Sequence, residues 1–294
     1  MSLPKIWPVP LLAVLLLVAC QAVPTGPAQD FVAATDTLAQ AESEYFDQLQ
    51  AASDESHVLL GAAIYVQGGP RFSAIAPELT KRDDFSKAKA IRMAVMAQLQ
   101  NYAQQVAAIT AAATGTWIAD DSKSATANVT TLLNDQKAAK LTRQQAGLIQ
   151  IAVQQLASAI VSGATARDLQ SLAQQARTPI NDIATMVAQD NANIESDNFA
   201  PGLMSDQQTA MIAMLNAVYA DPRVNSSQRF AAVMAWHAWR PSLVNKGSDI
   251  SNALAKLVKA NEALAAGQPL FAGALANQAA AVAQQALAIP SGAK

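Results

Sequence analysis

The chain has 294 residues and a net charge of −2, and 51% of its residues are hydrophobic against 14% charged. The length allows a buried core, the apolar content excludes a disordered chain, and the charge gives no electrostatic basis for nucleic-acid binding. One Cys and two His exclude an internal disulfide and a Cys-based zinc site, so we expect no metal and no cofactor.

The first 20 residues have the pattern of a secretory signal, in which a single basic residue, Lys5, precedes an apolar run over residues 11–18. This run is too short to span a bilayer. The sequence Leu17-Val18-Ala19-Cys20 at its end resembles the lipobox of bacterial lipoproteins. The resemblance implies cleavage before Cys20, a diacylglycerol thioether on its sulfur and acylation of the new amino group. An ordinary signal peptide, or a Cys buried in a first helix, is the alternative interpretation.

The resemblance divides the chain into a signal peptide over 1–19, a lipid anchor with its tether over 20–30, and a helical bundle domain over 31–294. Two or three acyl chains hold a protein on a membrane durably, whereas one chain holds it only marginally. Gln21 stands where lipoproteins kept in the inner membrane carry Asp. The resemblance therefore implies the outer membrane, facing the periplasm, rather than the inner membrane, and attachment to that membrane through Cys20.

The rest of the chain has the composition and spacing of long helices, because Ala, Gln and Leu are abundant and apolar residues recur every three or four positions. The pattern predicts a first helix from Asp30, as its cap, to about Val66. A second helix is predicted over 84–113, with Gly115 beyond its end, and a third over 121–140. The first two carry apolar stripes of Phe31, Leu38 and Tyr45, and of Ile91, Val95, Leu99, Tyr102, Val106 and Ile109.

The middle of the chain predicts one helix on either side of Gly163. A possible capping box of Thr142 and Gln145 precedes the first. The second contains Pro179, which is expected to kink or interrupt it. Their apolar stripes are Ile149, Val153, Leu156 and Ile160, and Leu169, Leu172, Ala176, Ile180, Ile183 and Val187.

The last third of the chain predicts three more helices. One starts near Ser205, a second runs from about Ser227 to before Pro241, and the last spans about 248–289, where Gly267 can divide it. The expected buried face of the last helix is Ile250, Leu254, Leu257, Asn261, Leu264, Phe271, Leu275, Val282 and Ile289.

Sustained spacing of three and four residues, with small Ala side chains, predicts closely packed antiparallel helices. Contacts rich in Ala bury little area per residue, so length has to compensate. We therefore predict an all-α fold, an elongated antiparallel bundle of long helices with coiled-coil-like packing.

One segment, residues 58–79, carries few charges and contains Gly68-Gly69-Pro70, which cannot continue a helix. It predicts either a connection folded over the core or an apolar hairpin at one end of the bundle. Such a hairpin would contact a membrane or a partner. The contacting residues would be Ile64, Tyr65, Phe72 and Ile75. A helical protein with one apolar hairpin resembles, in shape alone, some bacterial α-helical pore-forming toxins.

The densest aromatic cluster consists of Trp236, His237, Trp239 and Arg240. The two tryptophans share one helical face, so the cluster would either anchor a core or, with Phe230, line a ligand pocket that has the arginine at its rim. His237 is also one of two histidines that could serve a hydrolytic triad.

Motifs of the common catalytic classes are missing, since the sequence has no G-x-S-x-G, H-E-x-x-H, C-x-x-C or Gly-rich phosphate loop. No catalytic residue is assigned, and a role without catalysis is favoured. We expect a lipid-anchored envelope protein that binds or scaffolds a protein or another envelope component. The alternatives are a membrane-active, pore-forming-like protein, and a ligand-binding or hydrolytic protein that uses the cluster at Trp236–Arg240.

Overall fold

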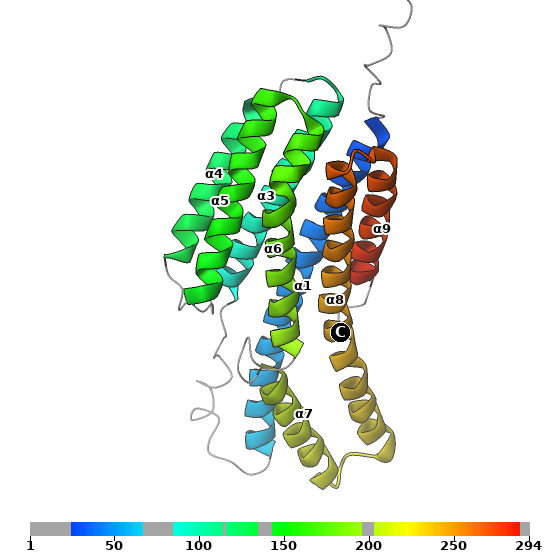
Figure 1. Cartoon of the computed structure of the whole chain (residues 1–294). Helices are drawn as coiled ribbons and strands as arrows, with labels where there is room; N and C mark the ends of the chain where they lie inside the picture. Colours follow the sequence, from blue (N-terminus) through cyan, green and yellow to red (C-terminus); the bar gives the residue numbers. More distant parts are fainter. Residues whose placement is uncertain (1–24, 67–84, 114–115, 135–142, 196–202, 289–294) are drawn as a thin grey trace, which may run out of the picture.

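The computed structural model describes residues 25–66, 85–113, 116–134, 143–195 and 203–288 (Figure 1). Side chains at 59–66, 193–195, 203–211 and 235–244, and at a few single positions, lie outside this description. Every regular element in the described part is an α-helix, so the prediction of an all-α fold is confirmed.

The helices of the described part follow one another along the chain in this order. They are α1 (Thr25–Val66), α3 (Ser86–Thr110), α4 (Thr116–Leu133), α5 (Arg143–Ala166), α6 (Leu169–Glu195), α7 (Leu203–Ala220), α8 (Ser226–Ala265) and α9 (Pro269–Ala288).

Helix α1 lies in the middle of the bundle, with α3 and α8 antiparallel to it and α9, which starts at the same end, parallel to it (Figure 1). Helix α1 packs against α3, α7, α8 and α9, while α6 packs against α5 and α8, and α4 covers α3 and α5. Helix α1 has 42 residues and α8 has 40, so each is about 60 Å long at 1.5 Å per residue. The bundle is therefore elongated, as its Ala-rich sequence predicts.

The two ends of the bundle contain different elements. The proximal end holds the start of α1 at Thr25 and the turn from α8 into α9 at residues 266–268. The distal end holds the last turns of α1, helix α7 and the turn at residues 221–225 that leads into α8. Helix α8 connects the two ends, so they lie about 60 Å apart.

The predicted apolar stripes of α1, α3, α5, α6 and α8 meet in one core. Large side chains that are almost completely buried there include Phe31, Leu38, Tyr45, Leu99, Tyr102, Val153, Leu156, Ile183, Val187, Leu254 and Leu257. These residues recur every three or four positions along each helix. The spacing of apolar residues was therefore enough to predict which side chains form the core.

Helix α9 reaches the core chiefly through small residues, while the predicted Leu275 and Val282 are only partly buried against it and Ile289 lies outside the described residues. Its buried face consists of Ala272, Gly273, Ala276, Ala279, Ala283 and Ala286, whereas Phe271 is 58% exposed. A Cβ on Gly273 would lie 2.8 Å from the Cα of Pro27, so the missing side chain allows α9 to approach the start of α1 closely. The prediction that Phe271 continues the buried face is wrong, because the small-residue face permits the closer helix contact.

Helix α8 corrects the predicted break near Pro241. It runs without interruption from Ser226 to Ala265, and a capping box of Asn225 and Gln228 opens it. Gly247, just before the predicted start of the last helix, lies inside α8. A Cβ there would lie 2.9 Å from the hydroxyl oxygen of Tyr45, so this glycine serves a close helix contact and does not end a helix.

Other helix boundaries differ from the prediction by up to about two turns. Helix α1 begins at Thr25, so the expected cap Asp30 is already helical, and α4 spans Thr116–Leu133 instead of 121–140. Helix α6 continues through Pro179, because packing against α5 and α8 on either side offsets the lost backbone hydrogen bond. The predicted division at Gly267 is confirmed by its φ of +71°.

Candidate functional site

A cluster of charged side chains lies in the middle of the core, where the sequence analysis did not identify it. Arg92 of α3 places Nη1 2.8 Å from Oε1 of Glu42 in α1, and Nη2 2.9 Å from Oδ2 of Asp190 in α6. The three side chains are at most 4% exposed. The guanidinium group of Arg92 also lies 5.7 Å from the centre of the Phe46 ring. One cation therefore joins three helices.

The two carboxyl groups of this cluster are supported differently. Asp190 accepts hydrogen bonds from Arg92 at 2.9 Å and from Nε2 of Gln145, in α5, at 3.0 Å. Among the described residues neither oxygen of Glu42 accepts a well-aligned hydrogen bond, although one lies within ion-pair distance of Arg92. Burial raises the pKa of Glu42; Arg92 opposes this shift and Asp190 adds to it. Burial also raises the pKa of Asp190, against the opposing effects of Arg92 and Gln145.

The cluster contains two carboxyl groups but one cation, Arg92. Two ionised carboxylates beside one guanidinium would leave one excess negative charge in a buried site. The raised pKa values favour binding of a proton to a carboxylate, which neutralises that charge. The cluster is enclosed by helices and offers a substrate no surface. Its position between α1, α3, α5 and α6 is instead suited to fixing the register of these helices.

Other buried polar contacts connect helices in the same way. Nδ2 of Asn191 in α6 donates to the backbone carbonyl of Gly247 in α8 at 2.9 Å. The hydroxyl of Tyr102 in α3 donates to the side chain of Asn261 in α8, whose Nδ2 donates to the carbonyl of Ala173 in α6 at 3.1 Å. These contacts satisfy polar groups that would otherwise be costly in an apolar core.

The sequence does contain a signal for the charged cluster. Glu42 follows Leu38 by four positions and precedes Tyr45 by three, so it lies on a buried stripe, and Asp190 follows Val187 by three. Charged residues at such positions are rarely buried without a partner. The sequence does not reveal the partner, because Arg92 and Asp190 are 98 positions apart.

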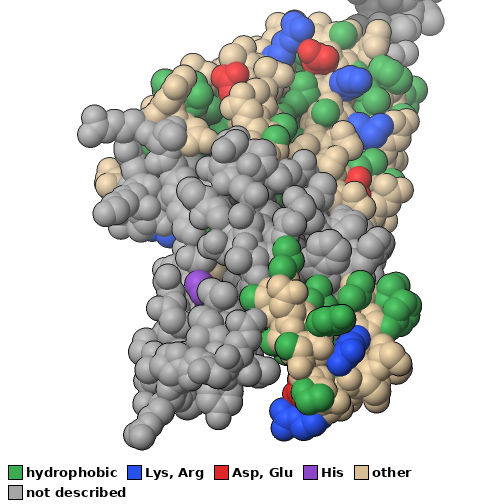
Figure 2. Space-filling view, turned by 90° about the horizontal axis from the view of Figure 1, so that it is seen from below, with side chains coloured by type: hydrophobic (Ala, Val, Ile, Leu, Met, Phe, Trp, Pro, Cys, Tyr) green, Lys and Arg blue, Asp and Glu red, His purple; other side chains and the backbone are tan. Residues whose placement is uncertain are grey.

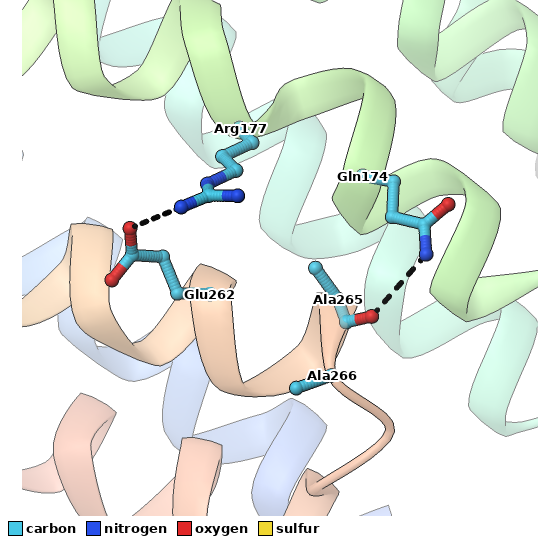
Figure 3. Close-up of a pocket in the computed structure, with 5 residues that line it drawn as sticks. All are labelled: Gln174, Arg177, Glu262, Ala265 and Ala266. Atoms are coloured by element: carbon cyan, nitrogen blue, oxygen red, sulfur yellow. Dashed lines mark hydrogen bonds and ion pairs between the residues drawn. The ribbon is translucent and has the colours of Figure 1, made fainter.

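An open pocket of about 500 Å³ lies between α6 and the end of α8, lined by Gln174, Arg177, Glu262, Ala265 and Ala266 (Figure 3). Arg177 and Glu262 reach toward each other and pair at 3.3 Å, and Nε2 of Gln174 donates to the carbonyl of Ala265 at 3.4 Å. These polar groups face each other between the helices and are exposed to water. The pocket lacks the buried, converging polar groups that fix a ligand, so we assign it a role in helix contact.

The distal end exposes apolar side chains, and we call this group the distal apolar surface. Its members are Ile212 and Tyr219 of α7 and Phe230, Val233 and Met234 of α8, between 45% and 75% exposed. Seen from below, hydrophobic side chains gather beside Lys or Arg side chains at this end (Figure 2). A contiguous exposed apolar group is typical of a contact site for another molecule.

The turn that carries this surface is held by an arginine network. Arg223 donates to Asp221 from Nε at 3.0 Å and from Nη2 at 2.7 Å. These hydrogen bonds lower the pKa of Asp221 to about 2. Arg229 donates to the carbonyl of Asp221 at 3.2 Å, and its guanidinium lies 5.2 Å from the centre of the Tyr219 ring. Tyr219 is therefore fixed in place although 75% of it is exposed.

Most residues that the sequence analysis singled out lie beyond the described side chains. The backbone of α8 includes Trp236, His237, Trp239 and Arg240, and that of α1 includes Ile64 and Tyr65. Cys20, Phe72 and Ile75 lie outside the described residues. Phe230, expected beside the tryptophans, is 67% exposed and belongs to the distal apolar surface.

In the described ranges no three His, Cys, Asp or Glu side chains gather into a group that could hold a metal ion. Within the same ranges one segment, Gln144–Ala166 in α5, is long and apolar enough to cross a membrane, and 44% of its most apolar stretch is buried. Its residues Ile149, Val153 and Leu156 belong to the core, so α5 serves as a bundle helix.

Comparisons with protein-family models, with curated proteins and with solved structures found no match for this chain. What bears on its function is its own chemistry: the lipobox resemblance, the charged cluster of the core and the distal apolar surface.

Proposed function

We propose that this protein is a lipid-anchored protein of the bacterial envelope that binds a partner protein through its distal apolar surface. The lipobox resemblance at Cys20 supports the anchor, and the missing catalytic motifs favour binding over catalysis. The observation that carries the proposal is the exposure of Tyr219 and Phe230, 75% and 67%, on the end of the bundle farthest from the anchor.

The chemistry of the distal apolar surface suits a protein partner. Tyr and Arg are enriched among the residues that contribute most to protein–protein binding, and here Arg229 stacks on Tyr219. Asp221 and Arg223 lie beside the apolar side chains, where they supply a polar rim. Because α8 is about 60 Å long, it would hold this surface well away from the membrane that carries the anchor.

The anchor is tested by mass spectrometry of the protein purified from membranes of its native host. We expect the N-terminal peptide to begin at Cys20 and to carry the mass of two or three acyl chains. A Cys20→Ser variant has no sulfur to acylate, so it should lack this mass and keep its leader. A native protein with a free thiol at Cys20 and an intact leader would contradict the anchor.

The binding surface is tested by photo-crosslinking in cells, with a photoreactive residue placed at Phe230. The matched control carries it at Ile151, which is 51% exposed on α5, away from the distal end. We expect a discrete adduct from position 230 that is absent from 151 and disappears when Tyr219→Ser is added. Both substituted side chains are exposed, so the free energy of unfolding should change by no more than about 0.5 kcal/mol. Identical adducts from both positions, or none from 230, would argue against the surface.

A membrane-active role is the second candidate, and one observation favours it. The last turns of α1, with Ile64 and Tyr65, lie at the distal end beside α7, so two apolar segments share that end. Dye release from vesicles by the purified protein, abolished by Phe230→Ser, would support this role. Crosslinking from position 230 without dye release supports the partner protein.

A further inference from the structure

We propose that the proximal end of the bundle rests directly on the lipid bilayer, with Trp117, Leu270 and Phe271 at the level of the lipid headgroups. This inference rests on the proposed acylation of Cys20. It adds a second membrane contact, made by the folded domain itself, to the contact made by the acyl chains.

Only a short length of chain separates the proposed anchor at Cys20 from the first described helix. Helix α1 begins at Thr25, five positions after Cys20. Five residues span at most about 18 Å when fully extended. With the acyl chains of Cys20 in the bilayer, the start of α1 is therefore held close to the membrane surface. The proximal end faces lipid whatever the distal end binds.

The start of α9 lies beside the start of α1. The contact between Gly273 and Pro27 brings the first turn of α9 against the first turn of α1. Leu270 and Phe271 precede this contact by a few positions, and they are 69% and 58% exposed. Since the core contact of α9 is made by Ala residues, these two large side chains have no packing role in the described bundle.

Trp117, at the start of α4, lies at the proximal end as well. Phe31 of α1 stacks edge-on against Tyr102 of α3 at 5.8 Å, which sets the end of α3 level with the start of α1. Gln98 of α3 donates to the carbonyl of Ser122 in α4 at 2.6 Å, so the antiparallel α4 begins at the same end. Trp117 is 54% exposed there, whereas its neighbour Ile118 is buried.

A bilayer fits these three residues better than a protein does. Among the described residues, only three large apolar side chains are exposed here, and they come from the first turns of α4 and α9. A bilayer needs no matching shape, and Trp is enriched at its headgroup level. Arg167 and Asp168 are exposed in the turn between α5 and α6, and Asp120 and Asp121 are exposed near Trp117. Acidic side chains outnumber this arginine, so the contact does not rely on attraction to anionic lipid.

The test uses the acylated full-length protein in vesicles of phosphatidylethanolamine and phosphatidylglycerol that contain brominated lipids. Acylation blocks the only native thiol, so an environment-sensitive fluorophore can be attached at Gln268→Cys, in the proximal turn. The matched control is Ser227→Cys, exposed at the distal end of α8, the helix that leads into this turn. We expect the brominated lipids to quench the fluorophore at 268 and not at 227, at low and high salt alike. Absence of quenching at 268, or stronger quenching at 227, would overturn the proposal.

Variants separate the bilayer contact from the anchor. We expect Leu270→Ser with Phe271→Ser to lower the ratio of quenched to unquenched fluorophore at 268 at least about tenfold. Phe230→Ser, an equally exposed change at the distal end, should leave that ratio unaltered. Mass spectrometry of the same samples reports acylation: an acylated protein without quenching at 268 contradicts the bilayer contact alone, and an unacylated native protein contradicts both proposals.

Discussion

At the scale of single residues, Arg92 is the group on which most of the buried charge depends. It is the cation within hydrogen-bonding distance of both Glu42 and Asp190, and all three side chains are buried. A buried pair adds little net stability compared with an apolar pair, but removal of one partner leaves the other charge uncompensated. The cost of changing Arg92 should therefore far exceed that of changing a surface cation.

We expect Arg92→Met to lower the free energy of unfolding by about 3–5 kcal/mol at neutral pH. The matched control is Lys89→Met in the same helix, because Lys89 pairs with Asp47 at 2.6 Å where Asp47 is 66% exposed. That change should cost less than about 1 kcal/mol. Urea denaturation of the two variants measures both values, and equal costs would show that the buried cluster contributes no more than a surface pair.

The charged cluster also predicts a dependence of stability on pH. Burial raises the folded-state pKa of Glu42 and Asp190 above the unfolded values. The folded protein then binds more protons than the unfolded chain in the interval between those pKa values, so the free energy of unfolding falls as pH rises through it. Glu42→Gln should flatten this fall, which begins as pH rises above the ordinary pKa of a Glu side chain, 4.5.

The pH series is measured by urea denaturation, with Glu262→Gln as the control. Glu262 pairs with Arg177 on the surface, so its substitution should leave the slope of stability against pH unchanged. Slopes that are parallel in the native protein and in Glu42→Gln would refute the assignment of this dependence to the cluster.

At the scale of helices, α5 and α6 approach each other through a glycine. A Cβ on Gly163 would lie 2.9 Å from Cδ1 and 3.2 Å from Cβ of Leu172, which is itself completely buried. The same helix contains Gly147, where a Cβ would meet nothing within 4 Å. Gly163 therefore allows a close contact between helices and Gly147 does not, although nothing in the sequence distinguishes the two positions.

We expect Gly163→Ala to lower the free energy of unfolding by about 1 kcal/mol or more, because the strain of the added methyl outweighs the better helix propensity of Ala. Gly147→Ala should instead raise it by up to about 1 kcal/mol. Thermal denaturation followed by circular dichroism compares the two. Stabilisation by both substitutions would mean that α5 and α6 are less closely packed than described.

At the scale of the whole molecule, the two ends have different tasks in our proposals. The proximal end carries Leu270 and Phe271 next to the start of α1, and the distal end carries Tyr219 and Phe230. Because α1 and α8 join these ends along most of the bundle, the fold acts as a spacer between a membrane contact and a partner contact.

The spacer predicts an elongated particle in solution. A compact domain of this size has a radius of gyration of about 19 Å. Small-angle X-ray scattering of a soluble form that begins at Gln21 should give a larger radius and a maximum dimension of at least about 60 Å, the length of α8. A radius at the compact value would contradict the extended arrangement of α7 and α8.

The sequence by itself determined that the chain is helical and where its main stripes are buried. Phe31, Leu38 and Tyr45, and the stripe from Ile91 to Val106, were assigned to the core from spacing alone and are buried there. This succeeds because helix propensity and the three-to-four-residue period depend only on residues a few positions apart. The lipobox resemblance at Cys20 is local in the same sense.

Only the tertiary structure decided which residues meet across the bundle. It buried the Ala face of α9 and left Phe271 exposed, it packed Gly247 of α8 against Tyr45, and it joined Arg92 to Glu42 and Asp190. Each of these outcomes depends on the distance of closest approach between helices far apart in the chain. Local spacing contains no information on that distance, because it is set by the small residues and charges that two helices present to each other once they pack.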